Sequence, residues 1–115
     1  MIKYEVIFLE MAKDFLDKLD IKTREKVIYN IWKLKEINDP ELFKKLTREI
    51  WEFRTNYLSK KVRLLAFWDK EKNHETLVIA THGFIKKSQK TPKQEIEKAE
   101  QLRTEYFIDK KKVKK

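Results

Sequence analysis

The N-terminal part of the chain shows two kinds of hydrophobic spacing, one typical of a strand and one typical of helices. Residues 2–9 alternate and then run apolar, which predicts a strand. Helical spacing follows over residues 11–19 and again over residues 21 to about 37, with Asp20 between them as a helix-capping residue type. A helical hairpin therefore follows the strand, and it ends before Pro40.

The middle of the chain alternates between short apolar segments and polar connections. A proline-led turn around Leu42 and Phe43 comes first, and three β-like segments rich in aromatic and branched residues follow it. The segments are Glu49–Thr55, Lys61–Asp69 and Glu75–Gly83, and the polar stretches between them are Asn56–Lys60 and Lys70–His74. Connections this short cannot hold a crossover helix, so the three segments are expected to form antiparallel hairpins.

The C-terminal segment begins at Thr91, where Thr-Pro-Lys-Gln combines a helix cap, a proline at the first helical position and a Gln that can close a capping box. The apolar stripe Ile96, Ala99, Leu102 and Tyr106 predicts a helix to about Phe107. Residues 109–115 have almost no apolar content and are expected to form a basic, disordered tail. The predicted fold is α+β: one domain over residues 1–108, with an N-terminal strand and helical hairpin packed on a small twisted antiparallel sheet, and a C-terminal helix.

Charge narrows the class of partner. The chain has 115 residues, with 28 Lys and Arg against 19 Asp and Glu, a formal net charge of +9 and a pI of about 9.6. This balance favours a polyanion such as nucleic acid as the partner, although a lysine-rich solvated face has the same composition.

No cysteine and only two histidines are present, so we expect no disulfide, metal or cofactor. No signal peptide or membrane-spanning run is apparent, which predicts a cytoplasmic protein with no membrane partner.

Two arginines lie within the predicted sheet. Alternation along the segment around Glu52 places Trp51 and Phe53 on one face and Glu52 with Arg54 on the other. Glu52 and Arg54 can be a surface ion pair or part of a site. Arg63 lies in a segment whose two faces are both apolar, so it is either an edge arginine whose head reaches water or a guanidinium held rigidly to bind phosphate.

A lysine-rich loop precedes the last helix. The sequence KKSQKTPK at 86–93 contains four lysines and no acidic residue, and it ends at a helix N-terminus, which itself attracts anions. The alternative is an ordinary solvated loop. If the loop lies beside the sheet arginines, the positive charge is concentrated in one groove. The candidate RNA-binding lysines are Lys90 and Lys93 of this loop, together with Lys60 and Lys61 at the start of the neighbouring strand.

Three segments carry a family resemblance: IWEFR at 50–54, VRLLAFW at 62–68, and the stretch 77–107, which contains H-x-F-x-K-K-x-x-K-T-P and an E-I-x-x-A helix. Together they resemble the phage-derived, HigB-like branch of the RelE/ParE toxin superfamily. The resemblance implies the toxin of a type II toxin–antitoxin module, which cleaves mRNA on the ribosome without a metal and is silenced by a co-encoded antitoxin, expected to be of the helix-turn-helix type. A ParE-like inhibitor of DNA gyrase and a non-catalytic RNA-binding module are the alternatives.

Metal-free RNA cleavage requires a base for the 2′-hydroxyl, stabilisation of the phosphorane and an acid for the 5′-oxygen. The resemblance places Arg54 and Arg63 at basic positions of the sheet, where we expect phosphate clamps. Lys86 and Lys87 compete for the basic position after the last strand, adding charge or acting as acid. Glu52 is the candidate base, and His82 is a second acid or base candidate, although its strand parity with Val78 and Ala80 also fits a buried structural role. Some relatives have a catalytic tyrosine near the C-terminus, to which Tyr106 can correspond, but Tyr106 lies on the apolar stripe and is interpreted as a core residue.

Overall fold

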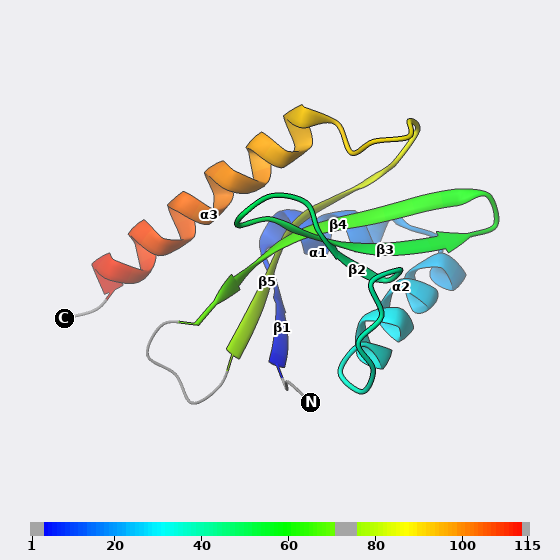
Figure 1. The fold of residues 1–115 in the computed structure, drawn as a ribbon, viewed down its shortest axis with the longest axis horizontal. Helices are drawn as coiled ribbons and strands as arrows, with labels where there is room; N and C mark the ends of the chain where they lie inside the picture. The colour runs from blue at the N-terminus through cyan, green and yellow to red at the C-terminus, as the bar shows by residue number, and fades with distance from the viewer. Residues whose placement is uncertain (1–3, 71–75, 114–115) are drawn as a thin grey trace.

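The computed structural model describes residues 4–70 and 76–113, which form a five-stranded sheet with helices on both faces (Figure 1). The elements in chain order are β1 (Tyr4–Phe8), α1 (Glu10–Lys18), α2 (Ile21–Lys33), β2 (Phe43–Lys45), β3 (Trp51–Tyr57), β4 (Lys60–Asp69), β5 (Thr76–Ile85) and α3 (Lys93–Val113). The predicted α+β class, the helical hairpin and the C-terminal helix are confirmed. Within the described residues, no helix is long and apolar enough to cross a membrane.

The sheet is mixed rather than antiparallel throughout. Its strand order is β1-β5-β4-β3-β2, and β1 pairs with β5 in parallel while the other neighbours are antiparallel. The predicted antiparallel pairing is therefore right for β3, β4 and β5, whereas β1 joins the sheet in parallel. Hydrophobic alternation marks a residue run as a strand but does not say which strand it pairs with, or in which direction.

The edge strand β2 was predicted as a turn. Phe43 pairs with Phe53 across the β2–β3 ladder, and the two rings stack with centroids 4.3 Å apart. The segment is only three residues long, so its sequence carries no detectable alternation. Tertiary pairing with β3 makes it a strand.

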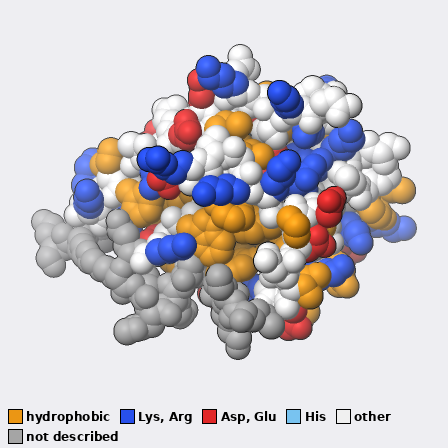
Figure 2. Space-filling view, viewed as in Figure 1, with side chains coloured by type: hydrophobic (Ala, Val, Ile, Leu, Met, Phe, Trp, Pro, Cys, Tyr) orange, Lys and Arg blue, Asp and Glu red, His pale blue; other side chains and the backbone are white. Residues whose placement is uncertain are grey.

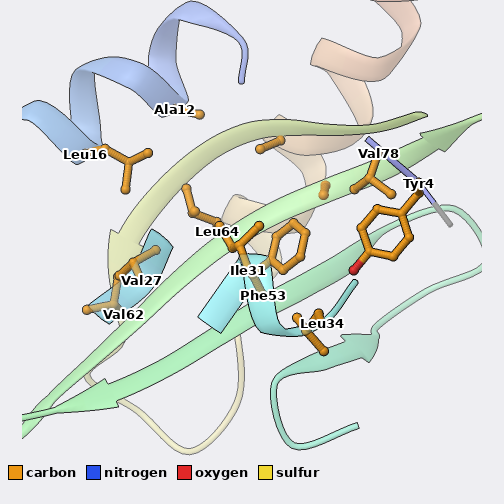
Figure 3. Packing of buried hydrophobic residues seen from close by; sticks show 12 residues of the cluster. Tyr4, Ala12, Leu16, Val27, Ile31, Leu34, Phe53, Val62, Leu64 and Val78 are labelled. Atoms are coloured by element: carbon orange, nitrogen blue, oxygen red, sulfur yellow. The ribbon is translucent and has the colours of Figure 1, made fainter. Parts of the chain in front are cut away.

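Two separate cores fix the sheet between its helices. On one face, Ala12 and Leu16 of α1 and Val27 and Ile31 of α2 pack against Phe53, Val62, Leu64, Val78 and neighbouring residues of the sheet (Figure 3). On the other face, Ala99 of α3 packs against Ile50, Leu65, Phe67 and Ile79. Because β4 is buried by helices on both faces, its sequence reads as a continuous apolar run, as expected for a central strand.

Gly83 allows the close contact between α1 and β5. A Cβ atom added at this position would lie 2.3 Å from Cδ2 of Phe15. Phe15 thus packs directly on the strand backbone, and this contact requires glycine.

The C-terminal helix is longer than predicted. Residues 109–113 continue α3 and are not a disordered tail, whereas residues 114 and 115 lie outside the described residues. Lys110 Nζ lies 2.6 Å from Oδ2 of the fully buried Asp69, which also accepts a 2.7 Å hydrogen bond from the Tyr106 hydroxyl. No local pattern indicates this contact, because Asp69 lies on a strand 41 residues away.

Candidate functional site

The β3–β4 hairpin brings the two sheet arginines together. Arg54 is paired with Arg63 in the antiparallel register, and the strands are joined by a two-residue turn, Leu58-Ser59, in which both residues have positive φ. Like charges directly opposite each other destabilise a sheet. Glu52 offsets this repulsion, because its Oε1 lies 3.7 Å from Arg54 Nε and 3.8 Å from Arg63 Nε.

Burial differs between the two arginines. Arg63 is 2% exposed and Glu52 is 1% exposed, whereas the Arg54 side chain is 25% exposed. Arg63 Nη1 donates to the Asn56 side-chain oxygen and to the Val62 carbonyl, both at 3.0 Å. Its head therefore does not reach water in the manner of an edge arginine. Burial is the main cause of the lowered pKa of Arg63; Glu52 raises that pKa and Arg54 lowers it further.

Both arginines retain unused hydrogen-bonding capacity. The Nε atoms of Arg54 and Arg63 are buried and have no hydrogen-bond partner among the described residues. A buried donor without a partner costs free energy, and such donors in native proteins call for a specific explanation, such as an ordered water or a bound ligand. Of the two side chains, that of Arg54 is the more exposed, at 25% against 2% for Arg63.

The loop before α3 is tied to Glu52. The Thr91 hydroxyl donates a short hydrogen bond to Glu52 Oε2. The predicted role of Thr91 as a helix cap is therefore wrong: α3 begins at Lys93, and its first turn closes when the Ile96 amide donates to the Pro92 carbonyl at 3.3 Å. Thr91 and Asn56 were both missed as site residues. Thr91 belongs to the K-T-P motif, but the motif does not show what its hydroxyl contacts, and only the fold brings Thr91 beside Glu52 and Asn56 beside Arg63.

Lys86 and Lys87 are distinguished by position. The Lys86 amide donates to the Lys61 carbonyl at 2.7 Å, which fixes the backbone beside the start of β4. Burial is the main cause of the lowered pKa of Lys86; Glu52 raises that pKa, while Arg63, Arg54 and Lys61 lower it further. Lys86 thus lies within electrostatic reach of all these groups, whereas the Lys87 side chain is exposed. We refer to Glu52, Arg54, Arg63 and Lys86 as the Glu52 site.

The other predicted lysines divide between the two faces. Lys61 precedes Arg63 by two residues and shares its face. Lys60 turns to the opposite side and contacts the Asp20 carboxylate at 2.8 Å, at the start of α2. Lys87, Lys90 and Lys93 are exposed along the loop and the first turn of α3. Figure 2 shows Lys and Arg side chains gathered over the region where β3, β4 and this loop meet in Figure 1.

His82 lies apart from the Glu52 site. A bulge in β5 shifts the register so that Leu65 pairs with His82 and Ala66 with Ala80. The predicted shared parity with Val78 and Ala80 is therefore wrong, and His82 faces α3. Its Nε2 lies 2.9 Å from Glu95 Oε1 and its Nδ1 lies 3.1 Å from the Thr81 hydroxyl.

Of the two roles considered for His82, the structure supports the buried, hydrogen-bonded one, since the residue is 3% exposed. Burial lowers its pKa, and the hydrogen bond with Glu95 works against that shift. Leu65 stands between His82 and Glu52 on the intervening strand. Tyr106 is likewise a core residue, because its ring lies edge-on to Phe67 at 5.3 Å.

The geometry of the Glu52 site suits a phosphate. Arg54 offers a positive, partly exposed guanidinium on a rigid strand, and the backbone of Lys86 is fixed beside the start of the neighbouring strand β4. Within residues 4–70 and 76–113, His, Cys, Asp and Glu form no group of three or more that could hold a metal ion.

Comparison with curated proteins finds none that matches this chain. The family model for the phage-derived Gp49-like proteins (DUF891), in contrast, matches residues 14–104, a span that begins within α1 and contains α2, strands β2 to β5 and the first half of α3. The chain therefore belongs to the phage-derived Gp49-like protein family.

Proposed function

We propose that this protein is the toxin of a type II toxin–antitoxin system and that it cleaves mRNA on the ribosome without a metal ion. The observation that carries the proposal is the Arg54 guanidinium, which is partly exposed and is held beside the Glu52 carboxylate on a rigid sheet. The net charge of +9 supports binding to mRNA and ribosomal RNA. A co-encoded antitoxin, of the helix-turn-helix type, is the proposed protein partner.

In the proposed reaction the ribose 2′-oxygen attacks the adjacent phosphorus and the bond from phosphorus to the 5′-oxygen breaks. The products are a 2′,3′-cyclic phosphate and a free 5′-hydroxyl. Arg54 donates to a non-bridging oxygen as negative charge develops there. Lys86 protonates the departing 5′-oxygen, a task that a lysine with lowered pKa performs better than an ordinary one. Solvent water takes the proton of the 2′-hydroxyl.

Glu52 and Arg63 act as positioning residues in this scheme rather than as base and clamp. Glu52 is almost fully buried and already accepts a hydrogen bond from Thr91. It faces two guanidinium groups that hold its negative charge in place. Arg63 is the cross-strand neighbour of Arg54 and is hydrogen-bonded to Asn56 and Val62. Together they fix the direction of Arg54. Lys87, Lys90, Lys93 and Lys61 then supply salt-sensitive contacts to RNA phosphates.

The burial of Glu52 and Arg63 also favours a second candidate, a non-catalytic RNA-binding module in which Arg54 and the lysines only hold phosphates. That module binds RNA without cutting it. A ParE-like inhibitor of gyrase is distinguished by supercoiling assays, in which the present proposal expects no inhibition.

The test is to incubate the purified protein with ribosomes programmed with a defined mRNA and to map the mRNA ends by primer extension. Arg54→Ala is expected to slow cleavage by about 10²–10³-fold, as for loss of one donor to a developing charge. Lys86→Ala is expected to slow it by about 10²–10⁴-fold, as for loss of a general acid. Lys33→Ala, an exposed lysine at the end of α2, is the control and leaves the rate unchanged. Intact mRNA with the wild-type protein contradicts the nuclease proposal.

The pH dependence separates the role of Lys86 from a simple loss of charge. The acid must be protonated, so wild-type cleavage falls as pH rises through the lowered pKa of Lys86. Lys86→Arg keeps the positive charge over this range but has no titration there. We expect this variant to be slower at neutral pH and to lose the alkaline fall in rate. The same alkaline fall in both proteins contradicts the assignment of Lys86 as the acid.

A further inference from the structure

An aromatic cleft lies on the face of the sheet opposite the Glu52 site. It has a volume of about 400 Å³ and is lined chiefly by Tyr4, Phe43, Trp51 and Trp68, with Leu34 and Asn38 from the end of the helical hairpin. This volume is within the range of small-molecule sites, roughly 300–1,000 Å³. Trp51 and Trp68 stand edge-on with ring centroids 5.9 Å apart, and Tyr4 stands edge-on to Trp68 at 5.3 Å. The rings therefore pack against one another and form a continuous aromatic lining for the cleft.

A buried polar group faces this cleft without a partner. Tyr4 is 8% exposed, and its hydroxyl is buried and has no hydrogen-bond partner among the described residues. Figure 3 shows this hydroxyl on the Leu34 side of the ring, and Leu34 also lines the cleft. Burial raises the pKa of Tyr4, so the hydroxyl stays neutral and can both donate and accept. An unmade hydrogen bond here costs free energy that a polar ligand atom would recover.

The lining also limits the charge of a ligand. Among the described residues that line the cleft, none carries a charged side chain, and a charge placed against an apolar lining without a partner is costly. At the rim, Lys70 Nζ lies 5.3 Å from the centre of the Trp68 ring. This ammonium group repels cations and attracts a phosphate attached to a ligand. A flat, uncharged ring with polar edge atoms fits these conditions, and a quaternary ammonium ion does not.

We propose that this cleft binds a single nucleobase, whose ring stacks on the tryptophans and whose polar edge bonds to the Tyr4 hydroxyl. The group that the cleft recognises is the base itself, and either a free nucleoside or a single-stranded RNA can supply it. Trp51 and Glu52 are neighbours on β3 with side chains on opposite faces, so the base in the cleft is not the one at the cleaved bond. The inference goes beyond the proposed cleavage and does not depend on it.

The test uses the intrinsic fluorescence of the protein without ribosomes. Of the three tryptophans, Trp32 is 64% exposed on α2, so a Trp32→Phe background leaves only the two tryptophans of the cleft. Adenosine and uridine are titrated separately, followed by a short single-stranded oligonucleotide with 2′-O-methyl riboses, which lacks the attacking hydroxyl. Saturable quenching is expected. Tighter binding of the oligonucleotide identifies a strand as the source of the base, and equal binding identifies a free nucleoside.

Substitutions of cleft residues test whether the nucleobase binds in the cleft. Tyr4→Phe is expected to weaken binding by roughly 2- to 12-fold, the loss of one hydrogen bond, and Trp68→Leu by roughly 5- to 150-fold, the loss of one stacking partner. Tyr29→Phe removes a hydroxyl from a 54% exposed tyrosine on α2 and is the matched control. If Trp68→Leu does not fold, Tyr4→Phe still tests the proposal. Absence of saturable quenching, or equal effects of Tyr4→Phe and Tyr29→Phe, overturns the proposal. Binding of N-acetyltryptophanamide as tight as that of the nucleosides overturns it as well, because the cleft then selects an indole of a protein partner.

Discussion

Glu52→Gln is the substitution that most directly tests how the buried charges are held. It removes one negative charge and keeps the shape of the side chain. Arg54 and Arg63 then face each other across β3 and β4 with no carboxylate between them. Because Arg63 is 2% exposed, water cannot replace the lost partner.

The magnitude follows from the distances. The carboxylate oxygen lies 3.7 Å from Arg54 Nε and 3.8 Å from Arg63 Nε. At an effective dielectric constant of about 20, each such pair of unit charges attracts by roughly 4–5 kcal/mol before the cost of desolvation. Removing one partner of a buried pair costs about 3–5 kcal/mol in proteins. We expect the lower end, about 3 kcal/mol, because the exposed part of Arg54 remains solvated.

The assay is urea unfolding followed by tryptophan fluorescence at pH 7, with the free energy of unfolding extrapolated to water. A loss of about 3 kcal/mol corresponds to a fall of about 12 °C or more in Tm for a domain of this size. Glu49→Gln is the matched control, because Glu49 pairs with Arg103 at 3.5 Å while 48% exposed. An exposed pair is worth less than about 1 kcal/mol.

A second substitution checks the cause. In Glu52→Gln combined with Arg63→Met, no uncompensated charge stays buried, and we expect the double variant to be more stable than Glu52→Gln alone. Equal stability losses for Glu52→Gln and Glu49→Gln would refute the reasoning, since they would mean that Arg54 and Arg63 do not need Glu52.

Three further predictions concern the two cores and the C-terminal helix. The folded-state pKa of His82 is below the ordinary value of 6.5, so the unfolded chain binds more protons and the free energy of unfolding falls as pH decreases below about 6.5. His82→Gln should lessen this fall between pH 7.5 and 5. Parallel curves of stability against pH for the two proteins contradict the assignment. Gly83→Ala should cost about 1–3 kcal/mol by crowding the Phe15 ring, and adding Phe15→Leu should recover part of it in the same urea assay. Lys110→Met should lower the free energy of unfolding by about 1–3 kcal/mol, because Lys110 contacts the buried Asp69. Lys111→Met, at the exposed next position, is the control and should change that free energy by less than about 0.5 kcal/mol. Equal effects of the two substitutions would show that the Asp69 contact contributes nothing.

The sequence alone determined which stretches are helices and strands wherever the hydrophobic repeat is long enough to be read. The helical hairpin, the strands β3 to β5 and α3 follow from spacing, and the alternation around Trp51 correctly put Phe53 in one core and Glu52 on the opposite face. These features are local, because each depends on residues a few positions apart. The pairing of the three residues of β2 and the direction of β1 are not local, so spacing did not indicate them.

The identities of the site residues were also present in the sequence, but their arrangement was decided by tertiary structure. Strand pairing set Arg54 opposite Arg63, and packing buried Arg63 while leaving Arg54 partly exposed. One extra residue in β5 turned His82 from one face to the other, because side-chain direction in a strand changes with every residue. Thr91 reaches Glu52 across 39 residues of sequence, so no local pattern could indicate it. Residue types and their periodicity are properties of the chain, whereas burial and contact between distant residues exist only once the sheet and α3 have packed together.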